Sequence, residues 1–292
     1  MKRTLVIGNG FDLDVGLKTS YGDFIKSGYW PFNHYAKVEN IDTLASFLKR
    51  KSQLNTWFDV EEALYEYAKK GGIEEKDLKY FETLKSSLTS YLLDQENGFT
   101  QNSNSTAIAV LNALLTCGEQ TKIYSFNYTD LRKIASRYAI TEDFSCEHMH
   151  GTTLNNDIIL GIGDKSDINS HYFYFKKVAS PNFSSHSIIP DMISSDEVII
   201  FGHSLGLNDH PYFVPYINSL LDYTTITEKR RTITIFTRNE SDKQELKKKL
   251  EELTGNRVTL LYSLNQINIF CTDGSESSNI WAYLKSINKD WQ

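Results

Sequence analysis

The chain has 292 residues, of which 40% are hydrophobic and 23% charged, as in ordinary globular proteins. This length suits one large α/β unit, and we expect residues 1–292 to form a single domain. The net charge of −6 argues against a broad basic surface, so nucleic acid is not an expected partner. The three cysteines are odd in number and widely spaced, which argues against a disulfide framework and a cysteine-rich zinc site.

The first residues, MKRTLVIGNG, hold only a short apolar run before two glycines. A secretory signal needs a longer apolar stretch and a cleavage site. Elsewhere, no run approaches the ~18 apolar residues of a membrane span. We therefore expect a cytoplasmic protein with no membrane partner.

The apolar run at residues 4–7 predicts a buried first strand, and a helix is expected to open between Thr19 and Lys26. Residues 40–118 differ, because several of their segments carry apolar residues at spacings of three and four. This pattern is typical of amphipathic helices. We therefore predict a helical insertion of about four helices over residues 40–118, between the first and second strands.

Apolar runs typical of strands then return. They lie at 121–126, 146–151, 157–162, 197–202, 232–237, 257–262 and 266–271. Stretches with helical spacing, at 130–138, 210–222 and 240–253, separate several of them. Such alternation predicts an α/β fold with a Rossmann-like parallel sheet covered on both faces. We interpret the aromatic-rich residues 164–186 as a long loop or lid.

The first candidate site follows the first strand and reads Gly8-Asn9-Gly10-Phe11-Asp12. Glycines here let the backbone approach a phosphate, and the amides before a helix favour an anion. The loop lacks the third glycine of the dehydrogenase fingerprint and the lysine of a P-loop. We expect these five residues to bind a nucleotide, with a plain tight turn as the alternative.

Polar residues also follow the second strand, in Phe126-Asn127-Tyr128-Thr129-Asp130. Side chains at the carboxyl end of a parallel strand point into the crevice where ligands bind. Thr129 and Asp130 can equally serve as a helix N-cap. Asn127 is harder to explain as a cap and is the stronger candidate for a ligand contact.

The motif His148-Met149-His150-Gly151 places two histidines on one face of the predicted strand. A metal site would need a third ligand, such as Asp209 or His210, and no standard zinc spacing is present. A single functional imidazole beside a glycine is the favoured interpretation. A histidine satisfied within the core remains the alternative.

A second glycine loop, Gly202-His203-Ser204-Leu205-Gly206, follows the strand run at 197–202. It matches the G-x-S-x-G pattern of α/β-hydrolases, but His210, the only later histidine, follows Ser204 by six residues. A loop that holds a ribose or phosphate fits better than an esterase. In the segment 57–62 of the helical insertion, Glu61 could face the cleft, but a solvated helix face is the favoured interpretation.

Four motifs in this order resemble the bacterial AbiH abortive-infection family, from residue 3 to about residue 215. They are VIGNGFDLDVGLKTSYGDF, FNYTD, HMHG and FGHSLGLNDHPYF. AbiH is in turn distantly similar to the sirtuin-like NAD-consuming domains of anti-phage systems. Gly8-Asn9-Gly10 resembles the sirtuin loop that holds NAD, and Asn127-Tyr128-Thr129 resembles the Asn-x-Asp motif. His150-Gly151 resembles the sirtuin His-Gly pair.

The second glycine loop resembles the Gly-Thr-Ser-Leu loop of sirtuins, and Asn239 resembles a late asparagine that contacts the adenine-side ribose. Two features depart from the sirtuin pattern: Thr129 replaces an aspartate, and the paired CxxC zinc module is missing. The resemblance therefore implies cleavage of NAD by water rather than protein deacylation. NAD would be the substrate, with no prosthetic group and no metal.

The resemblance also implies a role for each residue in an abortive-infection effector that acts as an NAD glycohydrolase. Gly8, Asn9 and Gly10 would hold phosphate, and Gly202 and Ser204 would hold the adenine-side ribose. Asn127 would orient the water and His150, with an ordinary pKa, would be the general base. A nucleotide-sensing module without catalysis and a metal-dependent nuclease remain alternatives. A homo-oligomer or a defence-system partner is also compatible with the sequence.

Overall fold

The structure, a computed structural model, describes residues 1–33, 43–54, 58–70, 75–164, 167–222 and 230–288. Within these residues six strands form one all-parallel sheet in the order β3-β2-β1-β4-β5-β6. They are β1 (Arg3–Ile7), β2 (Thr121–Ser125), β3 (Cys146–His148), β4 (Glu197–Phe201), β5 (Thr232–Thr237) and β6 (Gln266–Cys271). The order reverses between β1 and β4, as in dinucleotide-binding sheets, whose ligands bind at that reversal. The predicted Rossmann-like α/β fold is confirmed.

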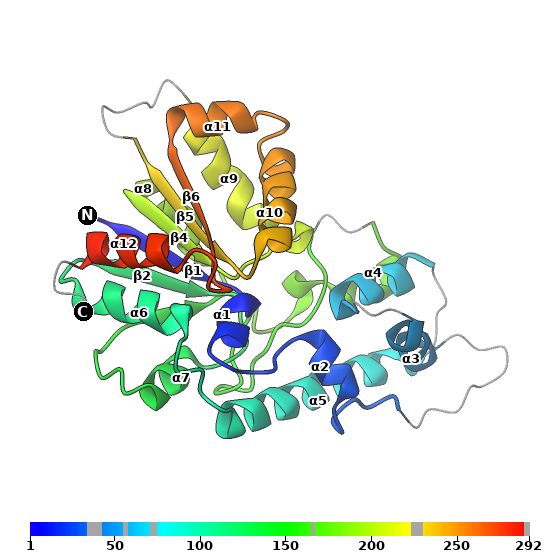
Figure 1. Cartoon of the computed structure of the whole chain (residues 1–292). Helices are drawn as coiled ribbons and strands as arrows, with labels where there is room; N and C mark the ends of the chain where they lie inside the picture. Colours follow the sequence, from blue (N-terminus) through cyan, green and yellow to red (C-terminus); the bar gives the residue numbers. More distant parts are fainter. Residues whose placement is uncertain (34–42, 55–57, 71–74, 165–166, 223–229, 289–292) are drawn as a thin grey trace.

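Helices cover both faces of the sheet (Figure 1). Leu5 and Ile7 of β1 pack in one core layer, and Val6 packs in the other. The first layer contains α6 (Thr106–Thr116), α7 (Leu131–Arg137) and α12 (Ser277–Ile287). The second contains α8 (Ile188–Ser194), α9 (His210–Leu221), α10 (Glu240–Leu253) and α11 (Val258–Leu264). Successive side chains of a strand point to opposite faces of the sheet. Because helices bury both faces, strand positions on both sides are largely apolar, which explains the continuous apolar runs in the sequence.

Between β1 and β2 the described chain is helical, as the apolar spacing predicts. The helices are α1 (Asn9–Asp14), α2 (Tyr21–Lys26), α3 (Leu44–Leu54), α4 (Val60–Lys70), α5 (Asp77–Gly98) and α6. In Figure 1, α2 to α5 lie together beyond the end of β1 that leads into α1, whereas α6 packs on the sheet. Residues 40–42 and Trp57, which the predicted insertion includes, lie outside the described residues.

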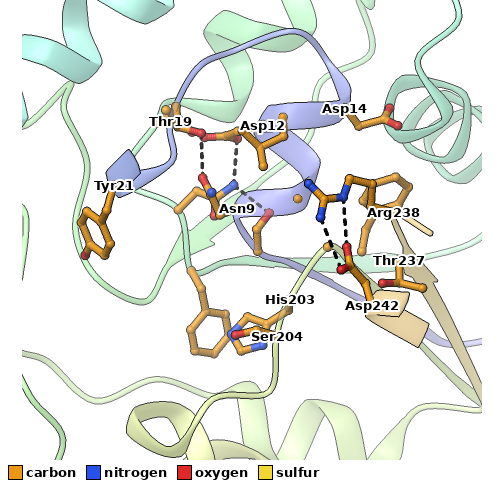
Figure 2. Close-up of a pocket in the computed structure, with 18 of the residues that line it drawn as sticks. Asn9, Asp12, Asp14, Thr19, Tyr21, His203, Ser204, Thr237, Arg238 and Asp242 are labelled. Carbon is orange, nitrogen blue, oxygen red and sulfur yellow. Dashed lines mark hydrogen bonds and ion pairs between the residues drawn. The ribbon is translucent and has the colours of Figure 1, made fainter. Parts of the chain in front are cut away.

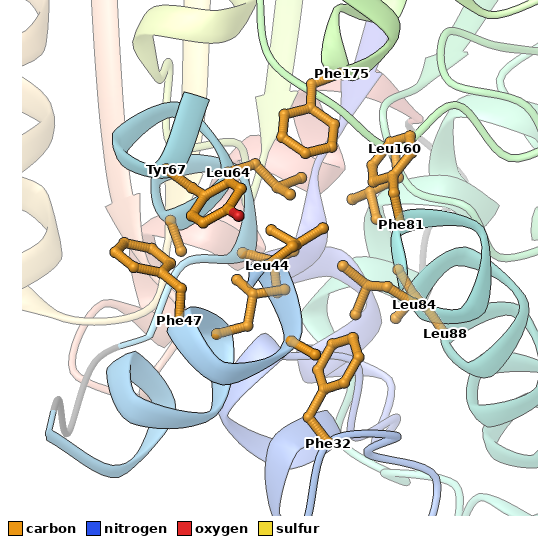
Figure 3. Close-up of a cluster of buried hydrophobic side chains, with 14 of the residues drawn as sticks. Phe32, Leu44, Phe47, Leu64, Tyr67, Phe81, Leu84, Leu88, Leu160 and Phe175 are labelled. Atoms are coloured by element: carbon orange, nitrogen blue, oxygen red, sulfur yellow. The ribbon is translucent and has the colours of Figure 1, made fainter. Parts of the chain in front are cut away.

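The helices α2 to α5 share a hydrophobic core of their own, to which the segment 158–175 contributes (Figure 3). Phe81 and Phe175 pack with ring centroids 4.9 Å apart. Inside this core, the buried Asp77 carboxylate accepts hydrogen bonds from the hydroxyls of Tyr67 (2.7 Å) and Tyr172 (2.9 Å). These bonds link α4 and α5 to the segment 158–175. The resulting helical layer lies over the carboxyl edge of the sheet.

Three sequence predictions of local structure are wrong. Residues 258–262 of the predicted strand 257–262 lie in helix α11, because a short apolar run does not distinguish the two structures. Residues 157–162 form no strand and pack into the helical core instead. The third predicted strand, 146–151, ends at His148. Within the predicted loop or lid, 164–186, Tyr172 and Phe175 are fully buried, whereas residues 181–185 are exposed.

Within the part of the chain that the structure describes, every helix is too short or too polar to cross a membrane.

The two glycine loops touch each other at the reversal of strand order. The Gly10 amide donates to the Gly202 carbonyl at 2.9 Å. A Cβ on Gly10 would lie 2.6 Å from the Gly202 Cα, and one on Gly202 would lie 2.4 Å from the Gly10 Cα. Gly202 also has a positive φ of 63°. A side chain therefore fits at neither position, and the glycines permit this contact between backbones.

We predict that Gly202→Ala lowers the free energy of unfolding by at least about 2 kcal/mol, since it combines left-handed strain with a backbone collision. The matched control is Gly206→Ala in the same loop, where the new Cβ would meet only the Ser204 hydroxyl at 3.5 Å. Urea denaturation of both variants measures the difference. Equal midpoints for the two variants would contradict the close contact.

Candidate functional site

A cavity of about 620 Å³ lies at the carboxyl edge of the sheet. This volume is in the range of small-molecule and cofactor sites. Residues that follow all six strands contribute to its wall, together with side chains from α2, α4, α5 and α10. The helical layer over the sheet edge therefore closes what would otherwise be an open crevice.

Asn127 links the first glycine loop to the cavity. Its Nδ2 donates to the Gly8 carbonyl (3.0 Å) and to Asp12 Oδ1 (2.8 Å). The Thr129 hydroxyl donates to Asp12 Oδ2 at 2.8 Å. Burial raises the pKa of Asp12 to about 7 against these hydrogen bonds. Since both amide hydrogens of Asn127 are bound by the loop, its carbonyl oxygen is the atom that it can offer a ligand.

The capping interpretation is correct for Asp130 but not for Thr129. The Asp130 side chain accepts from the Arg132 amide at 3.0 Å and caps α7. Thr129 instead lines the cavity and supports Asp12.

The amides of the first glycine loop are largely bound within the protein. Gly8 donates to the Phe201 carbonyl and Phe11 to the Gly8 carbonyl, each at 2.9 Å, in addition to the Gly10 bond to Gly202. The loop also forms the first turn of α1, whereas the sequence suggested a turn before a later helix. The side chain of Asn9, which accepts from Thr19 at 2.6 Å, lines the cavity (Figure 2).

His150 lies in the cavity wall but does not share a strand face with His148. Its Nε2 is 3.3 Å from Lys177 Nζ and 3.6 Å from Asp209 Oδ1. Burial, together with the Lys177 charge, lowers the pKa of His150 to about 3. The expectation of an ordinary histidine pKa is therefore wrong, because this imidazole is neutral and faces an ammonium group.

Lys177 is the buried cation of this end of the cavity, and its side chain is 8% exposed. Its Nζ is 3.3 Å from Glu61 Oε1 and 3.6 Å from Asp209 Oδ1. Burial alone would lower the pKa of Lys177, but the two carboxylates outweigh it and raise the pKa above its usual value. Lys177 is not among the site residues predicted from the sequence. The available signal was the pair of lysines that ends the aromatic segment SHYFYFKK, although this pair does not distinguish Lys177 from Lys176.

The expectation that Glu61 belongs to a solvated face is wrong. Its side chain is 13% exposed and lines the cavity, and its Oε2 accepts from Asn208 Nδ2 at 2.8 Å. Burial raises the pKa of Glu61 to about 7 even though Lys177 is beside it. The side of α4 that carries Glu61 faces Lys177, whereas the next residue, Glu62, is exposed.

Asp209 connects this cluster to the second glycine loop. Its Oδ2 is 3.2 Å from His203 Nε2. Because His203 Nδ1 accepts from the Leu205 amide (3.0 Å), the ring proton lies on Nε2 and points to Asp209. Burial would raise the pKa of Asp209, but Lys177 and His203 hold it well below its ordinary value. Among the described residues, Asp209 Oδ1 is one of two buried side-chain atoms without a hydrogen-bond partner.

The opposite end of the cavity is more open. Arg238 is 62% exposed, and its Nε is 3.1 Å from Asp242 Oδ2 (Figure 2). Gly202 and Ser204 line the cavity near the reversal of strand order. Asn239 is outside the cavity wall; its side chain accepts from the Asp242 amide at 3.0 Å and caps α10.

The structure thus gathers most, but not all, of the predicted site residues. One cavity is lined by eight of them: Gly8, Asn9, Gly10, Asp12, Asn127, His150, Gly202 and Ser204. Phe11 does not line it, because it is fully buried in the core against Phe201, with ring centroids 5.5 Å apart.

The histidines considered for a metal site do not converge. His148 Nδ1 is 3.3 Å from the Asn127 carbonyl, and His210 Nε2 is 3.2 Å from the Leu205 carbonyl. In the described ranges, no three His, Cys, Asp or Glu side chains are grouped to hold a metal ion.

Comparison with protein families gives one match. The family model described as bacteriophage abortive infection AbiH matches residues 4–235, a range that runs from within β1 to within β5 and contains the helical layer. Comparison with curated proteins finds no match.

We predict that Lys177→Met lowers the free energy of unfolding by about 3 kcal/mol at pH 8, because two buried carboxylates lose their cation. The loss should shrink below pH 7, where Glu61 takes up a proton. Lys176→Met, at a partly exposed neighbour, is the control. Urea denaturation at both pH values provides the comparison. If the two variants unfolded alike at pH 8, Lys177 would not be the buried counter-ion described here.

Proposed function

The chain belongs to the bacteriophage abortive infection AbiH family, and from this premise we propose that its cavity binds NAD and hydrolyses the nicotinamide–ribose bond. Membership of the family implies a role in abortive infection by phage. Depletion of NAD in an infected cell would stop phage growth together with the cell. NAD is the substrate in this proposal, and the protein supplies all the reacting groups.

One observation carries the proposal: the two glycine loops, Asn127 and His150 line a single cavity at the reversal of a 3-2-1-4-5-6 sheet. Dinucleotides bind at this position in sheets with this order. The similarity to sirtuin-like domains supports the same placement, since their corresponding motifs hold NAD. Asn127 joins the two halves of the site, because it holds the Gly8 loop and offers a carbonyl oxygen to the cavity.

The charge of the cavity wall agrees with NAD as the ligand. The wall contains eight carboxyl side chains, but only two cationic ones, Lys177 and Arg238. Such a wall repels a triphosphate more strongly than a ligand with two phosphate charges and a cationic base. NAD has a pyridinium ring and a doubly esterified pyrophosphate. When nicotinamide leaves, positive charge develops on the ribose C1′, and nearby carboxylates stabilise it.

A sensor that binds the nucleotide without cleaving it is the second candidate. It is favoured by the contact between His150 Nε2 and Lys177 Nζ, because an imidazole nitrogen that faces an ammonium is a poor general base. The expected role of His150 as the base is thereby weakened. Its remaining roles are to orient Lys177 and to contact a ribose hydroxyl.

We expect the purified protein to release nicotinamide from NAD with an equal amount of ADP-ribose, both measured by chromatography. Asn127→Ala should lower turnover about 10²-fold, because the water and the glycine loop both lose their positioning group. Asn155→Ala, at an exposed loop position, is the control and should leave turnover unchanged. Binding of NAD without release of nicotinamide, in the presence and absence of phage lysate, would favour the sensor.

We further expect turnover of NAD to survive prolonged treatment with EDTA, since the groups that position NAD and water in this proposal all belong to the protein. Turnover before and after chelation is the measurement. Loss of turnover on chelation, with recovery on addition of zinc or manganese, would instead favour the metal-dependent alternative.

A further inference from the structure

We propose that Glu61, supplied by the helical insertion, is the catalytic carboxylate that activates water for cleavage of the nicotinamide–ribose bond. The inference rests on the proposed hydrolysis of NAD and names a residue outside all the motifs that resemble sirtuins. The insertion would then supply a reacting group as well as a cover for the cavity.

The helix that carries Glu61 fixes its place in the cavity. Glu61 is the second residue of α4, and its amide donates to Asp59 Oδ1 at 2.8 Å. The Glu62 amide donates to the same oxygen at 3.2 Å, so Asp59 caps the helix through two bonds. The Glu61 side chain is then held by Lys177 at Oε1 and by Asn208 at Oε2. A carboxylate accepts about four hydrogen bonds, so each oxygen keeps a lone pair for water.

The other carboxylates that line this part of the cavity are less suited to the task. Asp209 is held ionised by Lys177 and His203, which makes it a weak base. Asp12 is only 2% exposed, against 13% for the Glu61 side chain, because Asn127 and Thr129 hold it beneath the glycine loop. Glu61 combines an accessible position with a pKa near neutrality, which is the range in which a general base is most effective.

An unpaired acceptor indicates that the reacting ribose lies at this end of the cavity. Asp209 Oδ1 is buried and without a hydrogen-bond partner among the described residues, although it lines the cavity. Lys177 Nζ and His150 Nε2 each lie 3.6 Å from this oxygen, too far to donate a hydrogen bond to it. A ligand hydroxyl would supply the missing hydrogen bond. A ribose hydroxyl is such a donor. With that ribose at Asp209, its C1′ would be near Glu61, because Lys177 Nζ is within 3.6 Å of both carboxylates.

The step balances without a further reactant. The bond between C1′ and the pyridinium nitrogen breaks, and its electron pair neutralises the nicotinamide ring. The oxygen of water bonds to C1′ while Glu61 takes a proton from that water. Release of this proton to solvent restores the carboxylate, so NAD and water yield ADP-ribose, nicotinamide and one proton.

Charged and titratable groups from every neighbouring element face Glu61. They are Lys177, Asp209, Asp59, Tyr21 and Tyr128. Only the ionised form of Glu61 accepts a proton, so kcat should rise with pH through a midpoint near 7, the value to which burial raises its pKa. A residue with a purely structural role would leave the pH profile unchanged.

The test compares Glu61→Gln with Glu62→Gln, which removes a carboxylate from the exposed next position of the same helix. We expect Glu61→Gln to lower kcat at least about 10²-fold and to abolish the rise with pH, while calorimetry shows NAD binding within about threefold of wild type. Glu62→Gln should retain the wild-type rate and profile. Glu61→Asp, which retains the charge on a shorter side chain, should keep the pH dependence at a reduced rate, and thermal unfolding verifies that each variant is folded.

Wild-type turnover and pH profile in a folded Glu61→Gln protein would overturn the assignment of Glu61 and leave NAD hydrolysis intact. The assignment would also be overturned if Glu61→Gln lost turnover while kcat of the wild type and of Glu61→Asp stayed constant across pH 7. Failure of the wild-type protein to release any nicotinamide would overturn the proposed function itself, and Glu61 with it.

Discussion

The inner end of the cavity depends on one buried cation. Lys177 contacts Glu61 of the helical layer, Asp209, which follows the second glycine loop, and His150, which follows β3. These segments are far apart in sequence, and a buried carboxylate without a counter-ion is strongly disfavoured. Lys177 therefore stabilises the assembly of the site. Burial and the Lys177 charge together lower the pKa of His150, and Lys177 with His203 lowers the pKa of Asp209.

The glycines at the reversal of strand order have a second role that the sequence does not reveal. Gly10 and Gly202 allow two loops to meet backbone to backbone, and the amide of Gly10 is consumed in that contact. A valine at Gly10 would therefore disturb packing before it disturbed a phosphate. The loops shape the mouth of the cavity, and Asn9 and Ser204 are the side chains that they present there.

The sequence predicts a parallel sheet, because buried parallel strands are continuous apolar runs and these runs alternate with helices. The order of the strands is known only from the structure. The prediction fails at 257–262, where seven residues pack as α11 against α9 and no periodicity distinguishes helix from strand. In the site, Asn127 and His150 are found because they directly follow strands. Glu61 and Lys177 are missed because each alone is typical of a solvated surface, and only the fold brings them together.

The central claim is that this cavity binds NAD with its nicotinamide ribose at Glu61 and its pyrophosphate beside the glycine loops. A crystal structure of the Glu61→Gln protein with NAD tests it most directly, since slow turnover preserves the ligand. The account predicts an unbroken nicotinamide–ribose bond, a ribose hydroxyl within hydrogen-bond distance of Asp209 Oδ1, and the adenosine toward Arg238. NAD bound in the reverse direction, or a cavity without nucleotide at saturating NAD, would contradict it.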